Sequence, residues 1–212
     1  MIALLVAALL SAPTDEAPMH ATLVEGIVTV TLASGGPAGP LAEGDSLHQG
    51  DTVVTQPGAR AEISMPSGSV IRLGESTRMS LGQVEPGKAF SAKLFLGNLW
   101  TKVHKLISAE TFHIETENGV AGVRGTEFRV EVAPGQQDLV RVYEGAVEVK
   151  AHDGSWTHRV EPNQELHFAR DRAAPPRAFE VNAESEHKFM KWVRSRPVKE
   201  GLERQHQRRK KR

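Results

Sequence analysis

Three glycines in seven residues surround one arginine, and this is the stretch of the sequence that could bind a phosphate. The residues are Gly119, Gly122, Arg124 and Gly125. Phosphate-binding loops need G-x-G-x-x-G or G-x-x-x-x-G-K-[ST], followed by a helix. Here the glycines recur at every third position, and the residues that follow alternate as in a strand. The pattern therefore predicts a sharp bend between strands, with Arg124 either bonding carbonyls at the bend or facing a partner.

Nine histidines raise the question of a metal site. His104 and His113 are nine positions apart in different segments, and His152 and His158 lie on either side of a turn. Zinc sites often use close pairs such as H-x-H or H-E-x-x-H, and neither motif occurs. The sequence predicts no metal site and no cofactor.

Residue types used in nucleophilic or acid–base catalysis are present, but they are not arranged for it. Ser67 lies in a P-S-G-S turn rather than in a G-x-S-x-G elbow, and the chain has no cysteine. Glu115 and Glu117 are two residues apart in an expected strand, which places both on one solvated face. We predict no catalytic residue, no enzymatic activity and no small-molecule substrate.

The elements that position these residues are predicted to be strands. From residue 21 to residue 168, short runs rich in Val, Ile and Thr alternate with clusters of Gly, Asp, Asn and Pro. This texture is typical of an all-β domain with closely spaced turns. The expected fold is an antiparallel β-sandwich or roll.

Several turns are predicted individually. Gly44-Asp45 and Gly50-Asp51 predict tight bends, because Gly accepts a positive φ and Asp can bond its own backbone. Pro66-Ser67-Gly68 predicts the turn of a hairpin. The apolar run Leu94–Ile107 has helical spacing in part, but Gly97-Asn98 inside it favours two short strands or a strand with a turn.

The sequence changes character after the β-rich region. Residues 169–182 have the composition of a linker, and residues 183–196 predict a short amphipathic helix, with Phe189, Trp192 and Val193 on one face. Residues 197–212 predict a disordered basic tail. Residues 185–212 hold 11 Lys/Arg and 3 Asp/Glu, so the remaining 15 and 23 leave an acidic body beside a basic tail.

Residues 1–20 predict a signal peptide or N-terminal hydrophobic segment followed by a short polar linker. The first twelve residues are an apolar run. Such a run is too short to cross a bilayer, which takes about 20 residues, but it suits a signal peptide. The alternative is a buried N-terminal strand or helix. Export predicts a periplasmic or otherwise extracytoplasmic location.

Four segments in this order resemble the FecR domain, a module named after the ferric-citrate signalling regulator. They are a Gly-Asp bend with its strand at Gly50–Thr55, a hairpin at Gly68–Leu73, a G-T-x-F-x-V strand at Gly125–Val130, and an E-G-containing strand pair at Val140–Val149. The resemblance covers the chain from about residue 23 to residue 168.

The resemblance implies an all-β domain that works outside the cytoplasm. In the family this domain is often the sensing half of a regulator that takes a signal from an outer-membrane TonB-dependent transducer and controls a sigma factor. The sequence shows no cytoplasmic anti-sigma segment before the β domain, so we expect a standalone form.

The expected function is a non-catalytic protein of the cell envelope that binds a protein or an anionic envelope component, with no nucleic-acid partner if it is exported. Candidate binding or motif residues are Gly122, Arg124, Gly125, Thr126, Phe128, Trp100 and Trp156, and the electrostatic tail is Arg208, Arg209, Lys210, Lys211 and Arg212. One alternative is a carbohydrate- or peptidoglycan-binding domain that uses exposed Trp100 or Trp156. Another is a cytoplasmic regulator whose tail binds nucleic acid.

Overall fold

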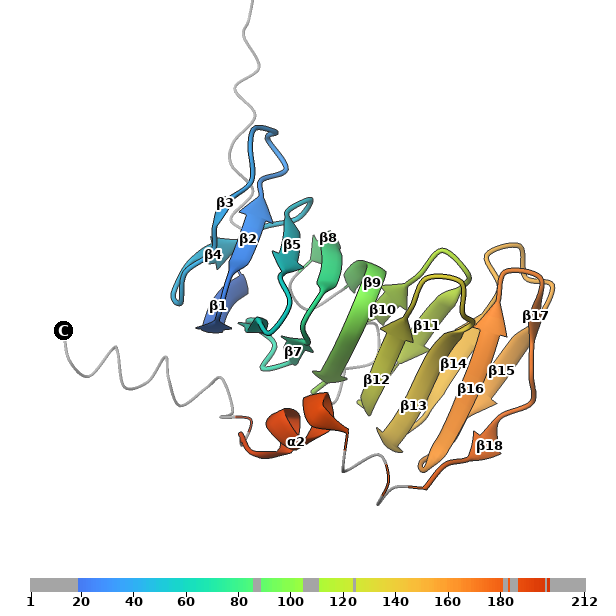
Figure 1. The fold of residues 1–212 in the computed structure, drawn as a ribbon. Helices are drawn as coiled ribbons and strands as arrows, with labels where there is room; N and C mark the ends of the chain where they lie inside the picture. Colours follow the sequence, from blue (N-terminus) through green and yellow to red (C-terminus); the bar gives the residue numbers. More distant parts are fainter. Residues whose placement is uncertain are drawn as a thin grey trace, which may run out of the picture.

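The computed structural model describes residues 19–85, 89–104, 111–123, 125–180, 183, 187–196 and 198. Its strands form two sheets that pack face to face (Figure 1). Sheet A contains β1 (Met19–Glu25), β4 (Ser46–Leu47), β6 (Arg60–Ser64), β7 (Val70–Leu73), β12 (Glu127–Val132), β13 (Asp138–Glu144), β16 (Gln164–Ala169), β17 (Arg172–Ala173) and β18 (Arg177–Ala178). Sheet B contains β2 (Val28–Thr31), β3 (Gly39–Pro40), β5 (Thr52–Thr55), β8 (Thr77–Glu85), β10 (Thr111–Glu115), β11 (Val120–Val123), β14 (Val147–Lys150) and β15 (Thr157–Val160). The all-β prediction is confirmed.

One long strand, β9 (Ala89–Lys102), belongs to both sheets. Its first part pairs with β8 and β10 in sheet B, and its second part pairs with β7 and β12 in sheet A. The change of sheet occurs at Gly97, whose φ is +97° and where a Cβ atom would lie 2.3 Å from Thr77 Oγ1. The prediction of a turn at Gly97-Asn98 is therefore wrong: the glycine allows a continuous strand to bend around the core.

The pairing is antiparallel with one exception among the described strands. β10 runs parallel to β9, in the register Phe112 with Phe90. The expected antiparallel β-sandwich or roll is therefore found, with this one parallel pair added to it. The residues that connect the two strands include 105–110, which lie outside the described residues.

The predicted turns are found at their expected positions. The Asp45 carboxylate accepts the Ala42 amide at 2.8 Å, and the Asp51 carboxylate accepts the amides of Ala33 and His48 at 2.9 Å. The β6–β7 hairpin closes with the Met65 amide donating to the Ser69 carbonyl at 2.9 Å. These local bonds set the register in which alternate apolar residues point between the two sheets.

The core lies between sheets A and B and is built from fully buried aliphatic and aromatic side chains. Examples from both sheets are Ile63, Leu99 and Phe128 in sheet A and Met79 and Ile114 in sheet B, all with an exposed fraction of 0%. A second apolar cluster lies on the opposite, outer face of sheet A. This outer cluster is formed with the one described helix, α2 (Lys188–Arg194).

The predicted amphipathic helix is thus present, and Figure 1 shows it beside the ends of the sheet A strands. Phe189, Met190, Trp192 and Val193 are buried. In the stretch expected to be a linker, β17 and β18 pair with β16 along the margin of sheet A. The signal-peptide prediction and the basic tail Arg208–Arg212 lie outside the described residues.

Candidate functional site

The bend that joins β11 to β12 carries the chain from sheet B to sheet A. Arg124 lies outside the described residues, and Gly125 follows it with a φ of +69°. The carbonyl of Thr126 accepts the Val103 amide at 2.8 Å. A second bend, at Gly145 between β13 and β14, packs on the first, because a Cβ atom on Gly145 would lie 2.7 Å from Gly125 O. The glycines let two backbones touch, which is a structural role.

The other candidate motif residues face different surroundings. Phe128 is fully buried between the sheets, while Gly122 lies on the outer face of sheet B opposite His113. Thr126 is 2% exposed, and its Oγ1 has no hydrogen-bond partner. The seven predicted residues therefore do not form one cluster. Three of them, Trp100, Gly125 and Thr126, line a single cavity of about 590 Å³.

This cavity lies between the end of sheet A and the C-terminal end of α2. Besides the three predicted residues, its wall includes Lys102, Glu127 and Glu144 from sheet A and Arg194 and Arg196 from the segment around α2. Lys102 lies 3.5 Å from a Glu127 carboxylate oxygen and 3.7 Å from one of Glu144. The cavity wall thus combines charged side chains of both signs with apolar ones such as Val103 and Val198.

Of the two candidate tryptophans, Trp100 is not available as a platform for a sugar. Trp100 is 2% exposed, packs under α2, and donates from Nε1 to Glu127 at 3.3 Å. Trp156 is half-buried against the core, with its ring 5.6 Å from that of Phe168. The carbohydrate-binding alternative required an exposed indole, and the burial of Trp100 leaves Trp156 as its remaining candidate.

Beneath α2 the outer face of sheet A forms a groove, which we call the α2 groove and define by Leu23, Glu62, Arg72, Trp100 and Tyr143. Into it α2 inserts four side chains that are at most 7% exposed. The groove has an apolar floor at its two ends and a charged pair in its centre. That pair determines how the helix is held.

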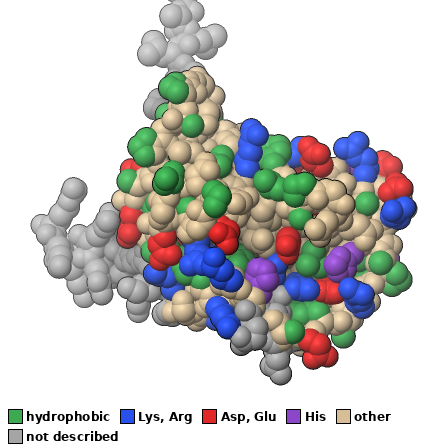
Figure 2. Space-filling model, in the orientation of Figure 1, with side chains coloured by type: hydrophobic (Ala, Val, Ile, Leu, Met, Phe, Trp, Pro, Cys, Tyr) green, Lys and Arg blue, Asp and Glu red, His purple; other side chains and the backbone are tan. Residues whose placement is uncertain are grey.

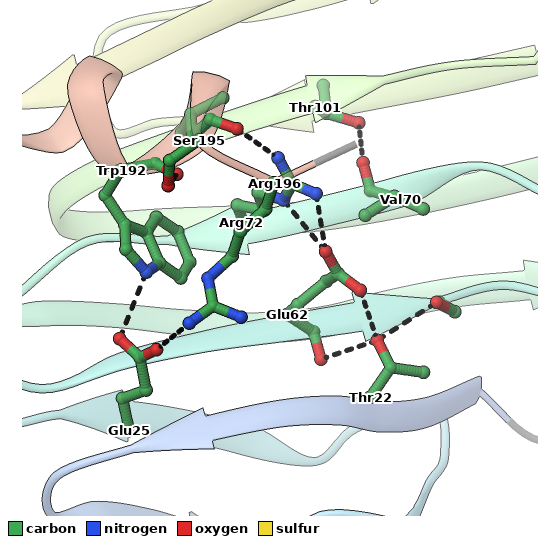
Figure 3. Close-up of polar contacts among 11 residues, drawn as sticks. Thr22, Glu25, Glu62, Val70, Arg72, Thr101, Trp192, Ser195 and Arg196 are labelled. Atoms are coloured by element: carbon green, nitrogen blue, oxygen red, sulfur yellow. Dashed lines mark hydrogen bonds and ion pairs between the residues drawn. The ribbon is translucent and has the colours of Figure 1, made fainter. Parts of the chain in front are cut away.

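Arg72 is the central residue of the groove and is 1% exposed (Figure 3). Its Nε donates to Glu62 Oε2 at 2.9 Å, and its Nη2 lies 2.8 Å from the same oxygen. Its Nη1 donates to the Val193 carbonyl at 2.6 Å, near the C-terminal end of α2. The guanidinium carbon lies 5.0 Å from the Trp100 ring centroid and 5.9 Å from that of Trp192. A buried charge is thus neutralised, bonded and stacked on both sides.

The rim of the α2 groove is acidic, and α2 meets it with hydrogen-bond donors. Trp192 Nε1 donates to Glu25 at 3.0 Å, and Arg196 forms an ion pair with the same carboxylate (Figure 3). Lys188 lies 3.3 Å from Glu75. The hydrogen bond from the Gly58 amide, and then that from Lys188, lower the pKa of Glu75. The helix and its rim are therefore complementary in charge.

The groove is one end of a row of polar residues that crosses sheet A in register. Glu62, Arg72, Trp100, Arg129, Arg141, Glu165 and Arg177 are successive cross-strand neighbours. At the far end, Glu165 is 4% exposed and lies 2.7 Å from Arg141 and 2.8 Å from Arg177. Burial opposes the ionisation of Glu165, but the hydrogen bonds from the two arginines outweigh it and lower its pKa.

No reactive constellation accompanies these contacts within the described ranges. No group of three His, Cys, Asp or Glu side chains there is placed to hold a metal ion. Burial, followed by the charge of Lys150, lowers the pKa of His113. Burial raises the pKa of Asp138, which is 1% exposed and has one carboxylate oxygen without a hydrogen-bond partner. These two groups lie in different strands and do not pair.

Glu62 and Arg72, the charged pair of the groove, were not predicted as site residues. The sequence held a signal for both residues, because each is a charged residue flanked by apolar ones. Arg72 lies between Ile71 and Leu73, and Glu62 lies between Ala61 and Ile63. Charged residues at such positions are rarely buried unless they are paired. Their cross-strand pairing could have been read from the predicted hairpin, but the helix that covers them could not.

Comparisons with known proteins agree with this architecture. Residues 51–148 match the family model described as FecR protein. This match supports a FecR-family domain within the chain. The bends at Asp51 and Gly125 and the crossing at Gly145 all lie within these residues. No curated protein matches the chain.

Solved structures similar to this chain include two of a "putative anti-sigma factor" from Parabacteroides distasonis ATCC 8503, at 2.50 and 1.65 Å resolution. Each has a TM-score of 0.55 and 18% sequence identity. The alignments span 64% of this chain and 64% and 65% of those chains, which is less than two thirds of either protein. At this identity the likeness shows a shared fold. Among the described residues, no helix has the length and apolar character needed to cross a membrane.

Proposed function

We propose that this chain is a FecR-type, non-catalytic module of the bacterial cell envelope that binds a protein partner in extracytoplasmic signalling or envelope organisation. The observation that carries the proposal is the use of the motif residues. Gly125 and Phe128 build the crossing between sheets and the core rather than a reactive centre. What the domain offers to other molecules is its outer surface.

That surface is charged and mixed rather than broadly apolar. Figure 2 shows acidic and basic side chains interspersed over the lower part of the molecule. The edge strand β15 pairs with β14 and has no second neighbour among the described strands, so its outer backbone groups are a place where a partner strand could add. The basic tail Arg208–Arg212 would hold the domain near anionic envelope components through salt-dependent attraction.

The location is tested first, by expressing the full chain in a bacterial host, fractionating the cells and measuring the intact mass. We expect a chain that begins between Pro13 and Met19 in the envelope fraction. A full-length chain found in the cytoplasm would contradict the proposal.

Partner binding is tested in the same cells with a photo-cross-linking amino acid. It replaces Thr157 on the free edge of β15 or Gly135 in the exposed loop between β12 and β13. We expect at least one position to cross-link a defined envelope protein, with less product at high salt if the basic tail assists. Exported chains that cross-link nothing at either position would count against a protein-binding role.

A further inference from the structure

The helix α2 gains little stability from its own sequence. It has seven residues, its N-cap residue His187 makes no side-chain capping bond, and its first turn has no acidic residue. Isolated helices shorter than about 12 residues are marginal in water. Its helical conformation therefore depends on the α2 groove, which supplies the apolar contacts and the bond from Arg72 to Val193.

The groove in turn requires a helix. Arg72 is fixed to sheet A by Glu62, and its Nη1 points at the position that the Val193 carbonyl occupies. If α2 left, Arg72 Nη1 would exchange the Val193 carbonyl for water, and the Trp100 indole would lose its apolar cover. Exposure of this apolar surface is unfavourable, and a second amphipathic helix is the cover that matches both the apolar contacts and the Arg72 donor.

Apart from the free edge of β15, strand addition has limited room elsewhere on the domain. The outer edges of β1, β2 and β16 are each paired over part of their length by two-residue strands: β4, β3, and β17 with β18. Short edge strands of this kind block pairing with other chains. The α2 groove is thus the surface whose shape and charge specify a ligand in most detail.

We propose that the α2 groove is a receptor for a basic amphipathic helix of a partner protein, and that α2 is the intramolecular competitor for that site. This deepens the proposed protein-binding function and rests on it. The partner helix has the same apolar pattern as α2, in which Phe189, Trp192 and Val193 are buried. It therefore carries an aromatic residue at one position, a Trp three positions later and an apolar residue directly after that Trp. Its terminal carbonyl accepts from Arg72, and its cations face the acidic rim at Glu25 and Glu75.

The probe is a fluorescent synthetic peptide of residues 187–198, titrated into the full chain and followed by anisotropy. In the wild-type chain α2 competes at an effective concentration of about 1 mM, so the peptide binds weakly. Trp192→Ala in the chain removes the main anchor of α2 and its bond to Glu25. We expect this variant to bind the peptide at least about 10-fold more tightly than wild type, because the competitor is weakened.

Four controls define the site. The Arg172→Ala variant of the chain, which changes an exposed side chain on β17, should bind the peptide as wild type does. Adding Arg72→Met to Trp192→Ala, or using a peptide that itself carries Trp192→Ala, should weaken binding about 10-fold. Equal binding of a scrambled peptide of the same charge would overturn the proposal, since simple electrostatic attraction would then explain the result.

A second measurement applies to the wild-type chain and does not depend on the variants folding. In hydrogen exchange, α2 amides should exchange at least about 100-fold faster than those of β9, because the helix opens without unfolding of the sheets. Equal protection of α2 and β9, or a folded Trp192→Ala chain that binds no peptide, would overturn the proposal. A concentration-dependent dimer joined through α2 would assign the groove to a second copy and overturn the partner assignment. Each of these results is independent of export and of the cellular cross-links.

Discussion

The outer faces of the two sheets carry similar residues and differ in what covers them. On sheet A, Glu62, Arg72 and Arg129 lie in one row across the strands, and each is at most 8% exposed. On sheet B a comparable row, His113, Gly122 and Glu148, lies in register across β10, β11 and β14, and none of the three is buried. Both rows come from strands in which polar and apolar residues alternate.

The difference teaches that an alternating strand specifies which side chains point away from the core, but not whether they meet water. On sheet A the outward charges are paired with one another and α2 adds an apolar cover. On sheet B the outward residues keep a solvent-facing surface. A buried polar face needs partners for its donors and acceptors: Arg72 bonds through Nε and Nη1, and its Nη2 has only the ion-pair contact with Glu62.

The largest expected effect is on the covered face. Arg72→Met leaves the Glu62 carboxylate buried without its partner and removes the bond to α2. We expect the free energy of unfolding to fall by about 3–5 kcal/mol, measured by denaturant titration. The matched change on the other sheet, Arg159→Met, removes a 71% exposed side chain and should change it by less than about 0.5 kcal/mol.

The double variant Glu62→Leu with Arg72→Met sharpens this prediction. Because it removes both charges, it should recover part of the loss. Equal effects of Arg72→Met and Arg159→Met would show that the covered and open faces are energetically equivalent.

A smaller effect is expected from adding one methyl group to a glycine on each face. The Cβ of Gly74→Ala would lie 3.1 Å from a Phe189 ring carbon of α2, and that of Gly122→Ala 3.2 Å from His113 Nδ1. Phe189 is held in the groove, whereas His113 can turn toward solvent. We expect Gly74→Ala to cost about 1–2 kcal/mol and to speed α2 hydrogen exchange, with Gly122→Ala close to neutral. A larger loss of stability from Gly122→Ala than from Gly74→Ala would contradict the comparison between the covered and open faces.

The smallest effect concerns Asp138, a buried carboxyl that lacks the pairing seen at Glu62. Its pKa is raised by burial, so its ionisation favours the unfolded chain, and stability is lost as pH rises from its unfolded pKa through its folded pKa. Asp138→Asn should therefore stabilise the protein by about 1 kcal/mol at pH 7, measured by thermal unfolding. The gain should shrink as the pH falls toward the ordinary pKa of Asp. A constant gain at all pH values would assign the effect to packing.

Much of the fold follows from local patterns in the chain. Bends at Asp45 and Asp51 are made by bonds between residues three apart, which is why turn chemistry predicts them. The turn predicted at Gly97 was wrong because the local sequence around a glycine is the same in two cases. The chain can reverse direction there, or a continuous strand can bend there. Contact with Thr77, twenty residues away in the sequence, decides the outcome.

The candidate residues divide in the same way. Phe128 and Val193 were predicted from alternation and helical spacing, and both are buried where those periods place them. Trp100 has the sequence context of either a core or a surface residue, and it is the docking of α2 that makes it part of the groove.

Periodicity along the chain thus determines strands, bends, the helix and its apolar face, because these depend on neighbours within a few residues. Tertiary structure alone decides that β9 pairs in both sheets. It also decides that α2, more than 100 residues further along the chain, covers Arg72 and accepts its hydrogen bond. The physical reason is that burial of a polar face is favourable only after all its partners have come together. Those partners lie in β6, β7, β9 and α2, and no local pattern specifies that they meet.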